Sequence, residues 1–395
     1  MKDERTTIIE WYITGEKILA FIMNHNSPEP QIWQSSGENW MKFRNWVNEY
    51  LQAYSTNQQH RQQWISDLET RLKDLAEILC LEKNLSFVSK ESDRLILIPH
   101  RFLHILPLHA LPVSPHFRGS SKGNEKCLFD LFARGVQYVP SCQLLKIVKN
   151  QQRSDFYNLF AIQNPTEELI YTDLEVQVVG SFFRQPEVLS KHNATEEAVK
   201  EYSNFASVHC AHFSCHGEFN PHFPLESALI LANKELWTLG EIFELFLPQC
   251  RLVTLSACET GFTDFSSFSD EYIGLPYGFL FAGSPSVVSS LWKVDELSTT
   301  FLMIKFYENL RQFPNRREGE IAVALQTAQQ WLRNLTISEL EGFLAQYKHQ
   351  FETIFAKWRP GQRKLFEESL KLIRQRQPQP FANSYYWAAF TAIGF

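Results

Sequence analysis

The sequence predicts an α/β protein of three layers, with helices on both faces of a mostly parallel sheet. Apolar runs of strand length alternate with amphipathic stretches along most of the chain, which is the pattern of a parallel sheet with helical crossovers. Several of these runs are almost continuously apolar, as expected of strands that are buried on both faces. The length of 395 residues allows either two subdomains or one large α/β unit.

The first predicted subdomain, residues 1–125, combines strands with a helical segment. Its expected elements are two strands, two amphipathic helices and a buried strand, at 8–14, 17–23, 39–54, 60–78 and 94–100. A turn with the sequence HILPLHALP then directs Pro107 and Leu108 toward the core. The run 112–125 is polar and rich in Gly and Ser, so it is predicted to be a linker that sets the boundary.

The second predicted subdomain, residues 126–395, carries the strand–helix alternation. Its expected strands are 135–140, 157–165, 207–216, 226–232, 251–258 and 286–292, and its expected helices are 141–150, 173–183, 195–204, 238–245, 275–282 and 299–311. Ser141 and Thr195 are suitable N-caps for two of these helices. Residues 338–377 break the alternation with charged amphipathic helices and are interpreted as an insertion.

Composition and charge indicate which classes of partner to expect. The formal net charge is −6, and the nearest approach to a basic run is Lys371–Arg376, so a nucleic-acid partner is not implied. The seven cysteines are odd in number and unevenly spaced, and the first residues lack the apolar core of a secretory signal, which favours reduced thiols and a cytoplasmic location. No apolar run reaches the ~18 residues that a membrane span needs.

Two of the apolar runs end in residues suited to acyl transfer. One ends at His216 and Gly217, and the other ends at Cys258. Because functional groups collect beyond the carboxyl ends of parallel strands, neighbouring strands would bring the imidazole and the thiol together. A nearby His favours the thiolate, which is the nucleophilic form of Cys. The backbone N–H groups of Gly217 and Cys258 are candidate donors to the oxyanion.

These residues also allow other interpretations. A Cys at the end of a strand is often structural, because cysteine is among the most buried residue types. A zinc site is suggested by a run of metal-type residues, namely His209, Cys210, His212, Cys215 and His216. Alternation along a strand divides them between two faces, so they do not converge on one ion and no metal is predicted. Serine-hydrolase and phosphate-loop chemistry are disfavoured, because neither a nucleophile elbow nor a Gly-rich phosphate loop occurs.

Five blocks of the sequence resemble the CHAT domain, both in their residues and in their order along the chain. They are LILIPHRFLHILPLHAL, FSCHGEFN, LVTLSACETG, GLPYGFLFAGSPSVVSSLWKVDE and YYWAAFTAIG. CHAT domains are similar to caspases and separases and are commonly attached to tetratricopeptide repeats in bacteria. The resemblance covers about 94–395 apart from the predicted insertion. It implies a caspase-like fold, preceded by a degenerate caspase-like half without catalytic residues.

The resemblance also implies roles for individual residues. It places the catalytic imidazole at His216, the nucleophile at Cys258 and the oxyanion donors at the N–H groups of Gly217 and Cys258, and it implies no cofactor. A carboxylate in the pocket for the residue before the scissile bond would select a basic side chain. The candidates for this pocket are Asp295, Glu259 and Asp264. No tetratricopeptide repeat is visible in the chain, so a separate repeat protein or another activator is a candidate partner.

The hypothesis that follows is a cysteine endopeptidase that makes limited cuts in a protein substrate, in bacterial defence or cell-death signalling. The alternative from another class is a non-catalytic scaffold that keeps the fold for binding. A third possibility is an enzyme that stays latent until a partner orders residues 262–270, directly after the nucleophile.

Overall fold

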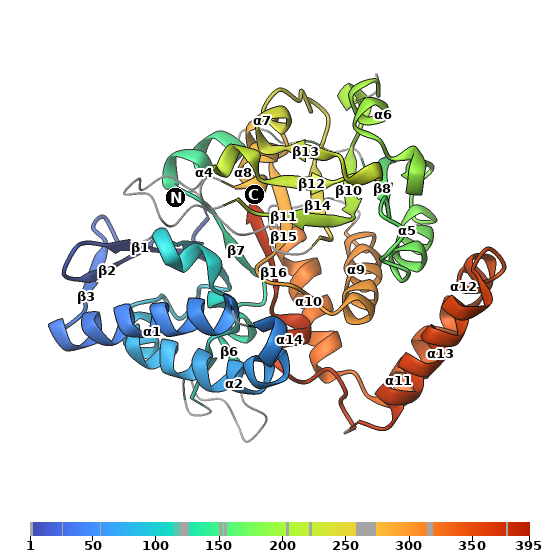
Figure 1. Cartoon of the computed structure of the whole chain (residues 1–395). Coiled ribbons are helices and arrows are strands. Elements are labelled where there is room, and N and C mark those ends of the chain that lie inside the picture. The colour runs from blue at the N-terminus through green and yellow to red at the C-terminus, as the bar shows by residue number, and fades with distance from the viewer. Residues whose placement is uncertain are drawn as a thin grey trace.

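The computed structural model is built around one long sheet (Figure 1). The structure describes residues 3–25, 27–55, 57–114, 117, 126–149, 153, 156–202, 205–220, 223–257, 274–313, 319–376 and 378–395. In spatial order, the described strands of the sheet are β3 (Gln31–Gln34), β2 (Ile18–Asn24), β1 (Thr6–Ile13), β4 (Arg94–Ile98), β7 (Val136–Tyr138), β16 (Phe390–Gly394), β15 (Ser286–Ser290), β14 (Leu252–Leu255), β10 (Cys210–Ser214), β8 (Asn158–Gln163) and β9 (Gln185–Ser190).

The sheet consists of two halves whose parallel strands run in opposite directions. Strands β15, β14, β10, β8 and β9 are mutually parallel, and so are β1, β4, β7 and β16. The C-terminal strand β16 joins the halves, because it pairs antiparallel with β15 and parallel with β7. The carboxyl ends of β8, β10, β14 and β15 therefore meet at one edge of the sheet, which we call the site edge. The carboxyl ends of β1, β4, β7 and β16 lie at the opposite edge.

Helices cover both faces of the C-terminal half. The described α-helices of the body are α1 (Gly37–Ser55), α2 (Asn57–Ile78), α3 (Leu81–Ser86), α4 (Cys142–Lys149), α5 (Thr172–Gly180), α6 (Glu196–Lys200), α7 (Leu239–Ile242), α8 (Leu275–Phe281), α9 (Glu296–Leu310), α10 (Glu320–Asn334) and α14 (Ser384–Trp387). Successive residues of β10 point to opposite faces. Phe213 stacks on Phe279 of α8 with ring centroids 5.2 Å apart, and His212 contacts Tyr307 of α9. The sheet thus lies between a layer with α8 and a layer with α9.

Short elements complete the chain. Two small antiparallel sheets comprise β11 (His216–Glu218), β12 (Ala228–Ile230) and β13 (Leu236–Thr238), and β5 (Pro112–Val113) and β6 (Lys126–Cys127). The described 3-10 helices are η1 (Arg101–Ile105), η2 (Leu108–Ala110), η4 (Leu128–Leu131), η5 (Lys191–Asn193), η6 (Phe205–Ser207), η7 (Pro224–Glu226) and η8 (Ala232–Lys234).

The helices of the predicted insertion extend from the body at the lower right of Figure 1. They are α11 (Ile337–Gln346), α12 (Lys348–Phe355) and α13 (Pro360–Arg374). Aromatic contacts hold their bases against the body: Phe343 packs on Phe301 of α9, and Phe366 packs beside Tyr171. The indole N–H of Trp358 donates a hydrogen bond to Asp173 Oδ2 at 3.2 Å. These helices are therefore docked on α5 and α9, which line the face below the site edge.

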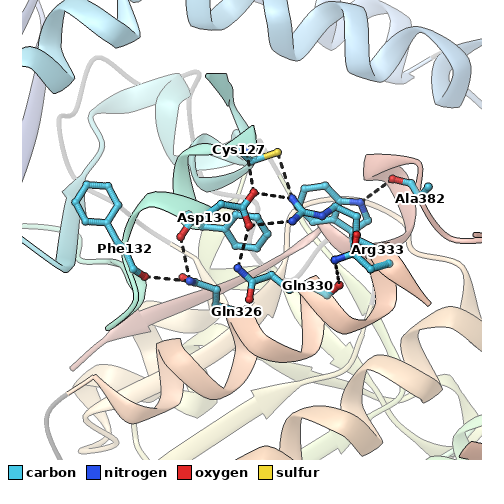
Figure 2. A network of polar contacts seen from close by, with 10 residues as sticks. Cys127, Asp130, Phe132, Gln326, Gln330, Arg333 and Ala382 are labelled. Carbon is cyan, nitrogen blue, oxygen red and sulfur yellow. Dashed lines mark hydrogen bonds and ion pairs between the residues drawn. The ribbon is translucent and has the colours of Figure 1, made fainter. Parts of the chain in front are cut away.

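A polar network joins the segment after β6 to α10 (Figure 2). Arg333 forms a two-pronged ion pair with Asp130, with both N–O distances at 2.9 Å. Gln330 donates to the same carboxylate, and so does the N–H of Cys127, the last residue of β6. Paired guanidinium and carboxylate groups are among the stronger polar contacts in proteins. The network therefore fixes the region after the predicted linker against the helical layer.

The structure confirms the predicted three-layer α/β class and most of the predicted elements. Three details differ. The apolar run 207–216 is not one strand, because β10 ends at Ser214 and His216 begins β11 in another sheet. The elements without a predicted counterpart include strands β3, β9 and β16 and helices α3, α10 and α14. The long sheet contains strands of both predicted subdomains, and the boundary at residue 125 stays a prediction.

Candidate active site

His216 lies at the site edge, just beyond the end of β10. Strand β10 pairs in parallel with β14, and each residue of β10 faces the residue 42 positions later, from Cys210 with Leu252 to Phe213 with Leu255. Both strands are fully buried. Their adjacency confirms that the two apolar runs are neighbours, which is the arrangement that the sequence required.

The backbone that leads to the predicted nucleophile is buried and hydrogen-bonded. Ser256 and Ala257 follow β14 and are buried. The Ala257 carbonyl accepts a hydrogen bond of 2.5 Å from Oγ of Ser290, the last residue of β15. Cys258, Glu259 and Asp264 lie outside the described residues, as does the segment 262–270. The neighbouring strands therefore constrain the backbone up to the residue that precedes Cys258.

The imidazole of His216 is about one-quarter exposed and faces a carboxylate. Its Nε2 lies 3.2 Å from Oε2 of Glu168, which follows β8, the neighbour of β10 on the other side. This ring nitrogen is buried, and it makes no hydrogen bond of good geometry to any described residue. The contact with Glu168 is therefore an ion pair by distance, without an aligned N–H. Sequence reasoning missed Glu168, because its nearness to His216 depends on the strand order.

Gly217, the predicted oxyanion donor, lies in the small sheet beside the site. It pairs with Leu229 of β12, while His216 pairs with Ile230. This pairing makes the strand after the imidazole part of a three-stranded sheet. The backbone of Gly217 is thus positioned by cross-strand register, immediately after the imidazole.

A buried polar network lies directly below the site. The phenol of Tyr307 is within hydrogen-bond distance of His212 Nδ1 (3.2 Å) and Thr254 Oγ1 (2.8 Å). The other ring nitrogen of His212 lies 2.9 Å from Glu175 Oε1, which also accepts a hydrogen bond from Ser214. Burial raises the pKa of Tyr307, which keeps the phenol neutral and able to donate. The network links β10 and β14 to α5 and α9.

The residues of the suggested zinc cluster have other roles. His212 belongs to the buried network, and His209 Nδ1 accepts hydrogen bonds from the N–H groups of Tyr157 and Asn158. Among the residues that the structure describes, no group of three or more metal-type side chains could hold an ion.

The other cysteine thiols with resolved shifts are poor nucleophiles. Burial raises the pKa of Cys210 well above its usual value and the pKa of Cys250 to about 11. Burial, with help from nearby Glu10, also raises the pKa of Cys142 to about 11. Thiols with such pKa values are protonated at neutral pH and therefore react slowly.

Two carboxylates follow β15 at the same edge. Asp295 caps α9, since its Oδ1 accepts a hydrogen bond from the Ser298 N–H at 2.9 Å. Glu296 Oε1 accepts one from the Tyr171 N–H. Burial raises the pKa of Glu296 to about 7, and the charges of Glu175 and Asp295 add to this increase. Asp295, the one predicted pocket residue that the structure describes, thus follows β15 at the site edge and caps α9.

Comparison with known proteins identifies the family. The model of the CHAT domain family matches residues 69–395. The chain belongs to the CHAT domain family. The match begins within α2, earlier than the resemblance at 94 in the sequence, and so part of the N-terminal helical segment belongs to the CHAT domain. No curated protein sequence matches this CHAT domain.

Solved structures share the fold of this CHAT domain. Separase of Saccharomyces cerevisiae in complex with securin matches with a TM-score of 0.53 and 14% identity, over 82% of this chain and 29% of the separase chain. A second separase–securin structure matches with a TM-score of 0.50 and 12% identity over the same shares. The Arg-specific cysteine proteinase gingipain R aligns with a TM-score of 0.44 and 9% identity, over 80% of this chain and 66% of that chain. The two separase matches show that the fold is caspase-like, and this chain spans less than one-third of the separase chain.

No described helix of the CHAT domain has both the length and the hydrophobicity needed to cross a bilayer.

Proposed function

We propose that this CHAT domain is a cysteine endopeptidase with Cys258 as nucleophile and His216 as general acid and base. One observation carries the proposal, namely the parallel pairing of β10 with β14. Residues of the two strands pair at a constant separation of 42 positions, and the same separation leads from His216 to Cys258. Two strand ends in register favour contact between an imidazole and a thiol at the site edge.

The chemistry proposed for this pair balances in two steps. In the first step, His216 takes the thiol proton, and the thiolate of Cys258 attacks the scissile carbonyl carbon. The tetrahedral intermediate collapses when His216 gives its proton to the leaving amine, which leaves a thioester on Cys258. In the second step, His216 takes a proton from water, and the resulting hydroxide displaces the thiolate as the acid product forms.

Backbone donors would stabilise the negative charge on the carbonyl oxygen. We assign this role to the N–H groups of Gly217 and Cys258. The register of β11 supports the first assignment, because cross-strand pairing holds Gly217 in place before substrate arrives. Donors that are fixed in advance need no reorganisation during the reaction, and for this reason they lower the barrier.

The proposed substrate is a protein cut after a selected residue. Glu259, Asp264 and Asp295 are the proposed pocket carboxylates, and their charge would favour a basic side chain before the scissile bond. Asp295 is supported by its place after β15 at the site edge. We further propose limited cleavage of a partner protein in bacterial defence or cell-death signalling, with a tetratricopeptide-repeat protein as a candidate activator. We also propose a cytoplasmic location, which the odd number and uneven spacing of the cysteines favour.

The proposal is tested by labelling the full chain with iodoacetamide and measuring the modification at each cysteine by peptide mass spectrometry. Site resolution matters because Cys142 is exposed and can be modified as well. We expect rapid modification of Cys258 that His216→Ala slows by at least tenfold, since the thiolate then loses its partner. Equal rates in both proteins would support the scaffold alternative. A weak signal that rises on addition of a candidate activator would identify a latent enzyme.

Substrate is identified in a separate experiment. Cys258→Ala keeps the fold and the pocket but has no nucleophile, so it should retain a protein substrate that the wild type cuts. Pull-down with Cys258→Ala, followed by incubation of the captured protein with the wild type and with His216→Ala, should give one or a few fragments from the wild type alone. Cleavage by His216→Ala as well as by the wild type would contradict the assignment of the pair.

A further inference from the structure

We infer that Glu168 is a positioning residue for the imidazole of His216, an inference that rests on the proposed function. The carboxylate Oε2 lies 3.2 Å from Nε2 of His216. Because this buried nitrogen has no aligned hydrogen bond within the described chain, a carboxylate at ion-pair distance supplies the acceptor that it lacks. A small rotation of either side chain would align the N–H with the carboxylate.

Chain topology places Glu168 beside His216. Strand β8 pairs in parallel with β10 up to Gln163 and Ser214, so both chains leave the sheet at the same edge. The N–H of Asn164 then donates to the Ser214 carbonyl at 2.9 Å. This bond fixes the start of the turn that carries Glu168, which we call the 164–168 turn, to the end of the strand that carries His216.

Internal contacts give the 164–168 turn one conformation. Asn164 Oδ1 accepts a hydrogen bond from the Leu169 N–H at 3.0 Å, which closes the turn across Glu168. Asn164 has a φ of 46° and Glu167 a φ of 60°. Asn tolerates this left-handed region, but Glu rarely adopts it. Such strain persists only where the surroundings over-determine the backbone, and it is concentrated at functional sites.

A second anchor holds the chain after the turn. The Thr172 hydroxyl donates to the Leu169 carbonyl at 2.7 Å, and Glu296 accepts from the Tyr171 N–H. The 164–168 turn is therefore fixed to β10 at its start and to α5 and α9 at its end. Glu168 extends from a rigid support, although its side chain is two-thirds exposed.

This placement determines which ring nitrogen serves the thiol. With Nε2 of His216 directed to Glu168, Nδ1 is the nitrogen available to Cys258. The imidazole gains a positive charge when it takes the thiol proton, and the carboxylate stabilises that charge. The third residue of a catalytic triad has the same role. Exposure limits the strength of this contact, because exposed ion pairs are weak and are screened by salt.

The test compares Glu168→Gln with Glu167→Gln, a matched control. Glu167 is the neighbouring exposed acid of the same turn, so both variants remove one negative charge from it. The readout is the rate of Cys258 modification by iodoacetamide, which is uncharged. We expect Glu168→Gln to slow modification about two- to fivefold at low ionic strength and Glu167→Gln to match the wild type. In 1 M NaCl the difference between Glu168→Gln and wild type should shrink.

Glu168→Asp provides a rescue, since it keeps the charge on a shorter side chain, and its rate should lie between those of Glu168→Gln and the wild type. Thermal unfolding should be the same in all three variants, because the side chain is mainly exposed. Equal rates for Glu168→Gln and Glu167→Gln would overturn the inference, as would a difference that salt does not change. His216→Ala separates this outcome from failure of the proposed function: if it slows labelling while Glu168→Gln does not, only the positioning role is wrong.

Discussion

Ser290 donates a hydrogen bond from Oγ to the carbonyl oxygen of Ala257, at 2.5 Å and fully buried. The bond joins the end of β15 to the residue bonded to Cys258. We expect Ser290→Ala to lower the free energy of unfolding by about 1–3 kcal/mol, because a buried carbonyl then loses a donor. It should also slow labelling of Cys258, because the backbone before the thiol is less fixed. Urea denaturation and mass spectrometry measure the two effects.

Ser289→Ala is the matched control for this prediction. Ser289 is the preceding residue of β15, is equally buried, and has a hydroxyl without a hydrogen bond to any described residue. Its replacement should therefore cost less stability and leave the labelling rate unchanged. Equal loss of labelling in both variants would argue against a specific role for the Ser290 bond.

Tyr307→Phe should weaken the buried network without changing the shape of the core. The phenol contacts His212 and Thr254, and all three residues are almost fully buried. Removing its oxygen leaves buried polar groups without a partner, so we expect a loss of about 1–3 kcal/mol in the free energy of unfolding. Chemical denaturation measures this loss. Tyr12→Phe, at a side chain with 43% exposure, serves as the control and should leave stability nearly unchanged; equal losses in the two variants would contradict the prediction.

Glu296 should make stability depend on pH between about 4.5 and 7. Burial raises its pKa from 4.5 to about 7 in the folded chain, so the folded state binds this proton more tightly than the unfolded state. The stability that this proton provides is present below pH 4.5 and is lost as the pH rises through 7. The loss amounts to up to about 3 kcal/mol.

Urea denaturation of wild type and Glu296→Gln at pH 5 and pH 8 checks this effect. The amide keeps an acceptor for the Tyr171 N–H but does not titrate. The wild type should therefore lose more stability than Glu296→Gln between the two pH values. Identical losses in the two proteins would show that Glu296 does not titrate in this range.

Trp64→Ala should lower stability by weakening the packing of α2 against the residues that follow β15. Trp64 of α2 packs edge-on against Trp292, which follows β15, and against Tyr385. Truncation of a buried Trp costs about 3–5 kcal/mol. Met41→Ala, at a half-exposed position of α1, should change stability by less than about 0.5 kcal/mol. Thermal and urea unfolding of both variants test the prediction, and a Trp64→Ala protein as stable as the wild type would contradict it.

Much of the fold could be predicted because local pattern reflects burial. The continuous apolar run at β4 is buried at every position, and the two apolar runs at β1 and β2 form a hairpin. Strand β9 escaped prediction because most of it is exposed and has no apolar periodicity. Helix α10 did carry a signal, since Ile321, Leu325, Ala328 and Leu332 recur at helical spacing and are buried.

The candidate site was only partly predictable. His216 stands out from the sequence because it ends an apolar run and matches a family motif, and the structure adds the break at Cys215 that moves it into a second sheet. Glu168 and Ser290 carry no comparable signal. Each acquires its role from a partner that is distant along the chain, namely His216 and Ala257.

The sequence by itself determined most of the elements of this protein, the CHAT motifs and the two candidate residues for peptide cleavage. Periodicity and motif spacing are local properties of the chain, so they can be recognised in the sequence alone. Only the tertiary structure decided that β16 lies between two oppositely directed halves, and that the chains after β8, β10, β14 and β15 leave the sheet at one edge. The physical reason is that strand order depends on which buried surfaces pack together across the whole chain, and a residue's own neighbours do not encode that choice.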